Sequence, residues 1–287
     1  MSPDVHGFFH EATSTVTYLV IDPQTRCAAL IDTVLDFEPA NGRVSRASIR
    51  NVLAEARRLN ADIKWILETH VHADHLSAAQ FAKQETAAPI VIGAEVNTIQ
   101  AIFAPRFRAT DIRPDGGDFD RLVRDGDELP LGAATIRVMQ TPGHTRACVS
   151  YLVGDAAFTG DTLFMPDYGT ARTDFPGGDA ATLYRSIQKI FSLPPSTRIF
   201  VGHDYKGAGR DAFAWETTVG AQRAGNVHIH DGIDEAAFVA ARKQRDAGLA
   251  PPRLLLAALQ VNIRGGRLPP ADEDGVARLR IPVSIAD

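Results

Sequence analysis

Four side chains that commonly bind metal ions stand within six residues of one another, in the string THVHADHL: His70, His72, Asp74 and His75. The interior of a helix would scatter these side chains, because residues two apart do not face each other. A turn that follows a strand can instead fold several of them around one point. The spacing therefore predicts a metal site on a loop that follows a strand, where catalytic residues commonly lie.

Three further candidate ligands come later in the chain, each at the end of a short apolar run that is typical of a strand. His144 lies in TPGHT, Asp161 in FTGDTLF and His203 in FVGHDY. Convergence of four strand ends would bring all these ligands together although they are far apart in the sequence. Imidazole and carboxylate groups in combination suit zinc, iron or manganese.

The segments around these residues show the periodicity of strands and helices. KWILET, just before His70, is apolar and β-prone, which predicts a buried strand that ends at the motif. Residues 45–60 repeat apolar residues at helical spacing, with Ser45 as the expected N-cap. The other expected elements are a hairpin (13–32), four helices (76–85, 94–103, 178–193 and 234–249), strands (88–93, 134–140, 155–160 and 197–202), a surface loop (109–126) and a C-terminal strand (254–263).

Composition is that of an ordinary globular protein, with 287 residues, 45% hydrophobic and 23% charged. The net charge of -5 and the lack of a Lys/Arg cluster argue against nucleic-acid binding. No stretch is long and apolar enough to predict a membrane span, and the first residues do not resemble a secretory signal. Two cysteines fit a reducing compartment, so we expect a cytoplasmic protein. No linker is visible, which predicts one domain over 1–287 with a C-terminal subregion from about 206–287.

The strings HVHADH, TPGHT, FTGDTLF and GHDY, in this order, resemble the metallo-β-lactamase superfamily over most of the chain. The resemblance implies an αββα sandwich, in which two mixed β-sheets pack face to face between helices. Two families come closest, the glyoxalase II-type thioesterases and the persulfide dioxygenases. The segment RTDF with the later TLY, and the stretch LAPPRLLLAALQVNIRGG, resemble the dioxygenases and favour them.

The dioxygenase resemblance implies one iron(II) per chain, held by His70, His144 and Asp161. The remaining residues of the set would line the pocket or orient the ligands through hydrogen bonds: His72, Asp74, His75 and His203. The implied reaction is the oxidation of glutathione persulfide, or a related small persulfide, by O2 to sulfite and the free thiol. The family also implies a homodimer.

The glyoxalase II resemblance implies a different use of the same seven residues. Two zinc ions would share a hydroxide and hydrolyse a glutathione thioester such as S-lactoylglutathione. One zinc would be held by His70, His72 and His144, and the other by Asp74, His75 and His203, with Asp161 bridging the two. Because every residue of both sets is present, ligand identity does not decide between the two reactions.

Arg172 and Tyr205 are the candidates for substrate binding and catalysis. Arg172 matches the arginine of the RTDF segment, where it would meet a glutathione carboxylate or brace the site through Asp174. Tyr205 directly follows the GHD string and would either contact substrate or be a half-buried core residue. Better-known dioxygenases have glycine before this arginine, whereas this chain has Ala171, which leaves the conformation of the loop open. Cys148 is expected to be a small buried residue rather than a reactive thiol.

Overall fold

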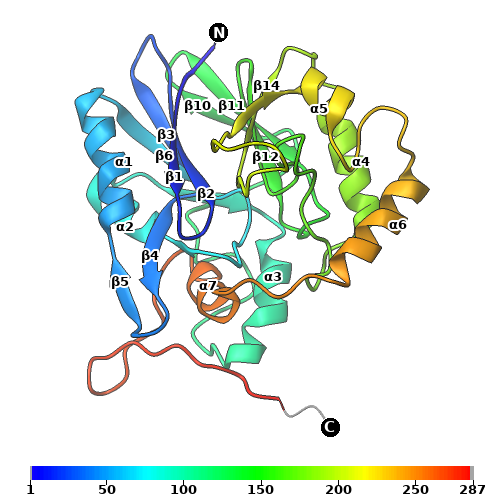
Figure 1. Cartoon of the computed structure of the whole chain (residues 1–287). Helices are drawn as coiled ribbons and strands as arrows, with labels where there is room; N and C mark the ends of the chain where they lie inside the picture. The colour runs from blue at the N-terminus through cyan, green and yellow to red at the C-terminus, as the bar shows by residue number, and fades with distance from the viewer. Residues whose placement is uncertain (1, 285–287) are drawn as a thin grey trace.

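Two six-stranded β-sheets lie face to face in the computed structural model, which describes residues 2–284 (Figure 1). The first sheet has the order β1 (Asp4–His10), β2 (Thr15–Ile21), β3 (Cys27–Ile31), β6 (Asp62–Leu67), β8 (Ile90–Gly93) and β9 (Arg121–Val123). The second has the order β10 (Glu128–Leu131), β11 (Ala134–Gln140), β12 (Val149–Val153), β13 (Ala156–Gly160), β14 (Arg198–Val201) and β15 (Glu216–Thr218). Both contain parallel and antiparallel pairs, so they are mixed sheets as expected.

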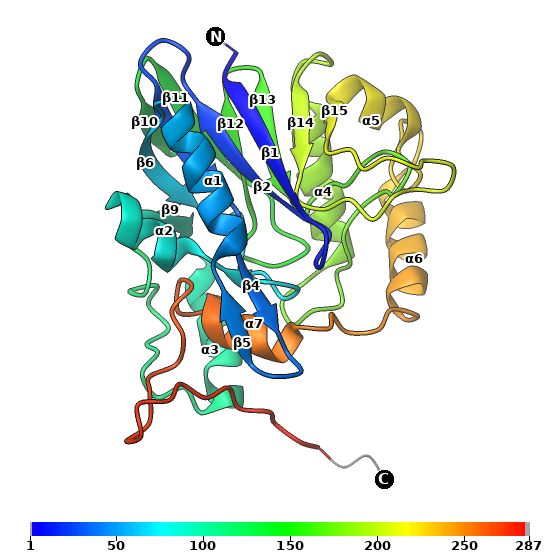
Figure 2. The same cartoon turned by 60° about the vertical axis from the view of Figure 1, so that its left-hand side comes forward.

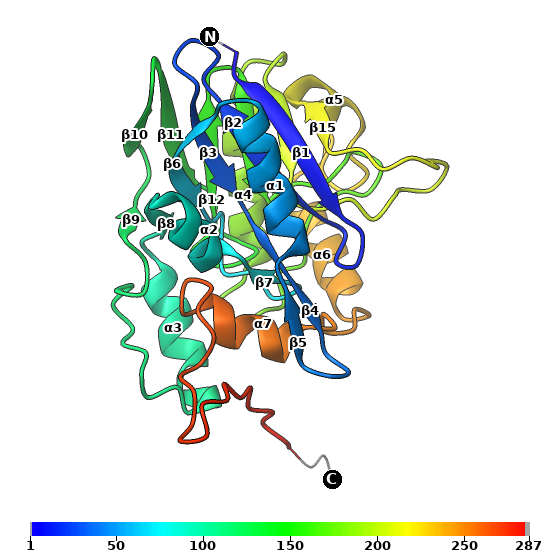
Figure 3. The same cartoon turned by 90° about the vertical axis from the view of Figure 1, so that its left-hand side faces the viewer.

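Helices cover the outer face of each sheet. Figures 2 and 3 show α1 (Ala47–Arg58) and α2 (Ala79–Thr86) against the first sheet. The second sheet is covered by α4 (Ala180–Phe191) and α5 (Val219–Gly225), and α6 (Glu235–Asp246) packs against α4. Below the sheets in these views lie α3 (Val96–Phe103), the 3-10 turn η1 (Pro105–Phe107), α7 (Leu255–Asn262) and a small sheet of β5 (Arg43–Ser45), β4 (Val34–Glu38) and β7 (Leu76–Ser77). The expected αββα architecture is confirmed.

The space between the sheets is filled by large aromatic side chains. Tyr18 lies edge-on to Phe158 and Phe200, with ring centres 5.3 and 5.6 Å apart. The Tyr18 hydroxyl donates to the carbonyl of Val201 at 2.6 Å, so this buried polar group is satisfied. Tyr151 donates in the same way to the carbonyl of Glu68 at 3.0 Å, which ties the second sheet to the residue that follows β6. These contacts fix the strand ends of the two sheets relative to each other.

The C-terminal stretch 254–263 is a helix, α7, and the predicted strand is wrong. A short apolar run does not distinguish a buried strand from a buried helix by periodicity alone. Here Ala, Leu and Gln favour the helix, and the helix packs among α3, β7 and the first sheet with Ala258, Leu259 and Val261 buried.

Two other local predictions are corrected. Helix α1 begins after Arg46 without a side-chain cap, and Ser45 belongs to strand β5. Instead, the side chain of Asp36 in β4 accepts a hydrogen bond from the backbone N–H of Ser48, at 3.1 Å, and so satisfies a free donor in the first turn of α1. The expected surface loop 109–126 contains strand β9, whose Val123 is buried. Within residues 2–284, no helix is long and apolar enough to cross a membrane.

Candidate metal centre

The candidate ligands lie on segments that follow strands, and the sheets bring these segments together. The metal-binding motif follows β6, and the other three residues follow β11, β13 and β14. The parallel pairing of β13 with β14 places the ends of those two strands side by side. The seven residues brought together are His70, His72, Asp74, His75, His144, Asp161 and His203.

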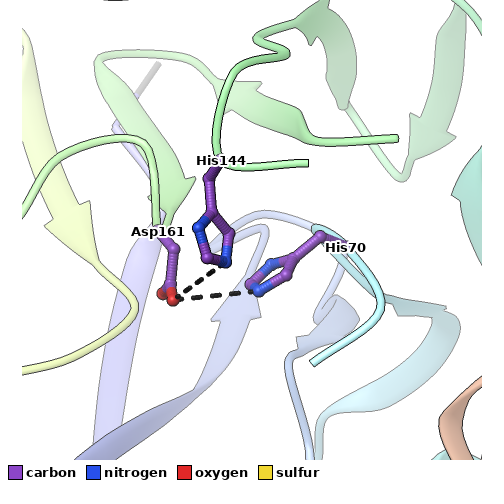
Figure 4. A group of neighbouring side chains, drawn as sticks. All are labelled: His70, His144 and Asp161. Carbon is purple, nitrogen blue, oxygen red and sulfur yellow. Dashed lines mark ion pairs between the residues drawn. The ribbon is translucent and has the colours of Figure 1, made fainter. Parts of the chain in front are cut away.

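His70, His144 and Asp161 form the first cluster, and all three are buried (Figure 4). The Nε2 atoms of His70 and His144 lie 3.8 and 3.7 Å from the same Asp161 oxygen, Oδ2. One ligand atom from each residue lies within 4.8 Å of the others. This is the donor set of two imidazoles and one carboxylate that non-haem iron(II) oxygenases use.

His72, Asp74 and His75 form a second cluster with the same 4.8 Å spread of ligand atoms. His203 joins the two clusters, because its Nε2 lies 3.3 Å from Asp161 Oδ1 and 3.4 Å from Asp74 Oδ2. The Asp74 carboxylate also accepts from Thr15 at 3.2 Å. The structure therefore places all seven predicted residues within one continuous site.

Several ring atoms in this site have no hydrogen-bond partner although they are buried. Within the described residues, the unpartnered buried side-chain atoms are Thr33 Oγ1, His70 Nε2, His72 Nδ1, His75 Nε2 and Asp161 Oδ1. Leaving such an atom unpaired costs about 1–3 kcal/mol. A cation at the first cluster would satisfy His70 Nε2 and Asp161, and a cation at the second would satisfy His72 Nδ1 and His75 Nε2, so the residues present fit metal binding.

In His144 and His203, the Nδ1 atom forms a hydrogen bond to a backbone carbonyl, and this bond orients the ring. His144 Nδ1 donates to the carbonyl of Arg172 at 2.8 Å, which leaves its Nε2 free to bind metal. His203 Nδ1 donates to the carbonyl of Ser14 at 3.2 Å. Partners of this kind fix the tautomer of a ligating histidine and contribute strongly to metal affinity.

Two buried carboxylates beside the motif were missed by the sequence reasoning. Asp32 accepts from the backbone N–H and the hydroxyl of Thr69, both at 2.8 Å, and from His72 Nε2 at 3.0 Å. Glu68 lies 3.3 Å from the same His72 nitrogen and accepts from Ser77 at 2.7 Å. Asp32 directly follows β3 and Glu68 directly follows β6, so their place at strand ends was the available signal.

The electrostatic environment differs between the histidines. Burial lowers the pKa of His70 well below its ordinary value and also lowers the pKa of His75, and neighbouring imidazoles add to both effects. Burial would lower the pKa of His72 as well, but the carboxylates of Asp32 and Glu68 outweigh it and raise that pKa. The neutral form favoured for His70 and His75 is the form that binds metal.

A cavity of about 410 Å³ opens above the first cluster. This volume lies in the roughly 300–1,000 Å³ range of small-molecule sites. His144 and Asp161 form part of its floor, and aromatic side chains form part of its wall: Phe164, Tyr168, Phe175 and Tyr205. The arrangement combines a polar metal-binding floor with an apolar wall, as expected for a site that takes a small molecule.

The guanidinium of Arg172 is engaged by the protein itself. It forms two hydrogen bonds to the Asp174 carboxylate, at 2.6 and 2.7 Å, and one to the carbonyl of Ala250 at 2.7 Å. Its Cζ lies 4.9 Å from the centre of the Phe175 ring. Since the Arg172 carbonyl also holds His144, these contacts favour the bracing role over direct capture of a substrate carboxylate.

Tyr205 lines the cavity and is 41% exposed, so it is not the half-buried core residue of the alternative interpretation. Its ring stacks on His203 with ring centres 5.3 Å apart. Cys148 is buried, as expected, and accepts from the backbone N–H of Thr145 at 3.3 Å. Burial raises the pKa of the Cys148 thiol to about 12, so this cysteine is not a nucleophile at neutral pH.

The sequence is similar to several known proteins along most of its length. A probable metallo-hydrolase of Burkholderia pseudomallei strain 1710b is 50% identical over 97% of this chain and 98% of that protein. A β-lactamase hydrolase-like protein of Xylella fastidiosa strain 9a5c is 46% identical over 99% of this chain, which spans only 65% of that relative's length. The mitochondrial persulfide dioxygenase ETHE1 of Homo sapiens is 31% identical over 69% of this chain and 67% of that protein.

The fold is also similar to solved structures. The crystal structure of ETHE1 from Myxococcus xanthus superposes with a TM-score of 0.73 at 31% identity, covering 92% of this chain and 100% of that one. The sequence model of the metallo-β-lactamase superfamily matches residues 11–203, the part of the chain that carries all seven candidate ligands. The chain therefore belongs to the metallo-β-lactamase superfamily.

Proposed function

We propose that this protein is a persulfide dioxygenase that oxidises glutathione persulfide, or a related small persulfide, with O2 at a mononuclear iron(II) site. The observation that carries the proposal is the buried cluster of His70, His144 and Asp161, in which two imidazole nitrogens lie 3.8 and 3.7 Å from one carboxylate oxygen. The similarity to the human persulfide dioxygenase and to the Myxococcus structure supports this choice.

The proposed reaction converts one persulfide, one O2 and one water into the thiol, bisulfite and a proton. The terminal sulfur gives up four electrons and O2 takes them, while the sulfur–sulfur bond breaks and the carrier leaves as the thiol. A bound iron(II) would supply the electron transfer between sulfur and O2.

The residues of this chain hold and shield the reacting groups. Burial keeps His70 neutral, and the Arg172 carbonyl orients His144, so both rings present Nε2 to one point. Phe164, Phe175 and Tyr205 limit the access of water from the side of the cavity. The proposed reaction needs no protein nucleophile, which agrees with the raised pKa of the only cysteine near the site among the described residues.

Oxygen uptake on addition of glutathione persulfide tests the proposal directly. Protein reconstituted with iron(II) is expected to consume O2 and release sulfite, whereas a zinc-loaded sample and a His144→Ala variant are expected to do neither. An iron-loaded protein that consumes no O2 would overturn the proposal.

A dinuclear zinc hydrolase is the second candidate, and one observation favours it. His72 Nδ1 and His75 Nε2, which the iron site would not use and the two-zinc site would, are buried without a hydrogen-bond partner, as zinc ligands would be. The candidate reaction is the cleavage of a glutathione thioester such as S-lactoylglutathione. Thioester cleavage by the zinc-loaded sample, with two zinc ions per chain and no O2 uptake by the iron-loaded sample, is the result expected from this function.

A further inference from the structure

A second, much smaller cavity lies between helices α3 and α7, next to the metal-binding loop. It measures about 20 Å³, and we call it the inner cavity. Its lining includes Val71 of the loop, Ile99 and Phe103 of α3, and Leu255 and Leu259 of α7. Figures 1 and 3 show the two helices side by side below the sheets. The inner cavity is therefore a hollow within the apolar core.

The inner cavity borders the cavity of about 410 Å³ above the first cluster, which we call the main cavity. Ala73, His144 and Phe175 line both of them. Because His144 is a ligand of the proposed iron site, the wall between the two cavities contains a residue that would hold the metal. The inner cavity therefore adjoins the metal centre as well as the main cavity.

Toward the solvent, the inner cavity borders a depression of about 280 Å³, which we call the outer hollow. Leu256, which is 37% exposed, and the exposed Pro282 belong to the outer hollow. Phe103, Leu255 and Leu259 line both the outer hollow and the inner cavity. Leu255 is only partly buried, and side chains near the surface change rotamer within picoseconds to nanoseconds. This shared apolar wall can therefore open for a small molecule.

The size and the lining of the inner cavity favour a small apolar molecule as its occupant. About 20 Å³ gives room for one small molecule and excludes a thiol carrier. Aliphatic and aromatic side chains offer a water molecule few of the hydrogen-bond partners that it needs, and cavities of this kind stay dry and bind apolar gases. Of the two substrates of the proposed reaction, O2 is the small apolar one.

We propose that the inner cavity is an O2-binding site, and that O2 travels from the outer hollow through this site to the metal centre. This inference rests on the proposed function and adds a second entrance to the active site. The persulfide enters through the main cavity, which is large enough for it. Separate entrances let O2 arrive when the larger substrate already fills the main cavity.

Xenon binding to the metal-free protein, measured by xenon NMR, tests the site without turnover. Xenon is apolar and binds in dry cavities. Ile99→Phe fills the inner cavity, whereas Ile99→Ala enlarges it. We expect saturable xenon binding in the wild type that is lost in Ile99→Phe and kept in Ile99→Ala. Ile102→Phe is the matched control with unchanged binding, because it makes the same change on α3 at a partly buried position outside the lining.

The dependence of the initial rate on O2 concentration, at saturating glutathione persulfide, tests the route in the iron-loaded protein. We expect kcat/KM for O2 to fall about 10-fold in Ile99→Phe, because a bulky ring in a packed space adds a barrier to passage. Ile99→Ala is expected to keep or raise this value, and KM for glutathione persulfide is expected to stay within about twofold in both variants. A general loss of stability would instead lower kcat/KM for O2 in both.

Leu255→Trp narrows the wall between the outer hollow and the inner cavity at a partly buried position, and it is the second variant should Ile99→Phe fail to fold. We expect it to lower kcat/KM for O2 as well. Unchanged values in the folded variants, or no xenon binding by the wild type, would overturn the O2 site. An iron-loaded wild type that consumes no O2 would overturn the proposed function and this route together, whereas normal O2 uptake without xenon binding would overturn the O2 site alone.

Discussion

A single buried carboxylate, Asp32, organises the loop that carries the metal-binding motif. It accepts two hydrogen bonds from Thr69, the residue before the motif, and one from His72. It does so with a backbone φ of +52°, a conformation that is uncommon for residues other than glycine but more accessible to Asp and Asn. The metal-binding motif is therefore held in place by the side chain of a residue far away in the sequence.

Asp32→Asn tests this role, because asparagine keeps the size and the tolerance for positive φ but loses the charge. The Thr69 hydroxyl that donates to Asp32 lies 3.0 Å from Nδ1 of the ligand His70. We therefore expect metal affinity to fall about 10–100-fold, the usual effect of disturbing the hydrogen bonds behind a ligating histidine. Competition with a chelator measures it. Asp62→Asn, at the exposed start of β6, is the control, and equal affinities for the two variants would contradict the assignment.

At the scale of elements, helix α7 reaches back to the same loop through one side chain. Asn262 Nδ2 donates to the carbonyls of His72 and His75, at 2.8 and 2.7 Å, and Oδ1 accepts from the N–H of Ser77 at 2.8 Å. Asn262 and the residues it contacts are all buried, so water has little access to replace these hydrogen bonds. Helix α7 therefore fastens the turn of the metal-binding loop to the core.

Asn262→Asp keeps the acceptor and removes both donors. Two buried carbonyls then lose their partners, so we expect the free energy of unfolding to fall by about 2–4 kcal/mol. Urea denaturation of the metal-free protein measures this change. Leu256→Ala, an exposed position on the same helix, is expected to change the free energy by less than about 1 kcal/mol. A similar loss in both variants would show that α7 acts only through general packing.

The sequence predicted the motif and the strands that precede each ligand because these signals are local. His70 to His75 lie within one turn, and each later ligand follows its own apolar run. The hydrogen bonds of Asn262 could not be predicted from the sequence. They join residues at least 185 positions apart, and the sequence predicted a strand where α7 lies. The cap of α1 was misplaced for a related reason, since Asp36 supplies it from another element.

At the scale of the whole molecule, stability depends on pH through His228, which lies on the segment between α5 and α6. Its Nδ1 accepts from the backbone N–H of Thr170 at 3.0 Å, and that role requires an unprotonated nitrogen. Burial, with the charges of Arg242 and Arg245, lowers the pKa of His228 to about 4. The unfolded chain, with a pKa of about 6.5, then binds more protons than the folded one between about pH 6.5 and pH 4.

Stability from His228 is therefore complete above about pH 6.5 and is lost as the pH falls toward about 4. His228→Asn offers an acceptor that does not titrate. We expect the difference in unfolding free energy between the wild type and this variant to be largest near pH 7 and to shrink with acidification. Urea denaturation of the metal-free proteins across this range measures it, and a constant difference would contradict the lowered pKa.

The proposal that residues 1–287 form one domain predicts that both sheets unfold together. Each sheet carries a tryptophan: Trp65 in β6 donates to the carbonyl of Pro130 at 2.7 Å, and Trp215, next to β15, stacks near Phe9 of β1. The two rings thus report on two different contacts between the first sheet and the second. In a single domain, all probes follow one transition.

The variant Trp65→Phe keeps Trp215 as the only tryptophan of the chain, and the variant Trp215→Phe keeps Trp65. Unfolding of each variant is followed by the fluorescence of the tryptophan that remains. We expect the two urea transitions of the metal-free proteins, each referred to the circular dichroism of the same variant, to coincide within error. Because β15 belongs to the same sheet as β10–β14, the segment after about residue 206 cannot leave without opening that sheet and releasing α7 from the metal-binding loop. An earlier fluorescence transition for Trp215 alone, with Trp65 still native, would show instead that the C-terminal subregion unfolds as a separate unit.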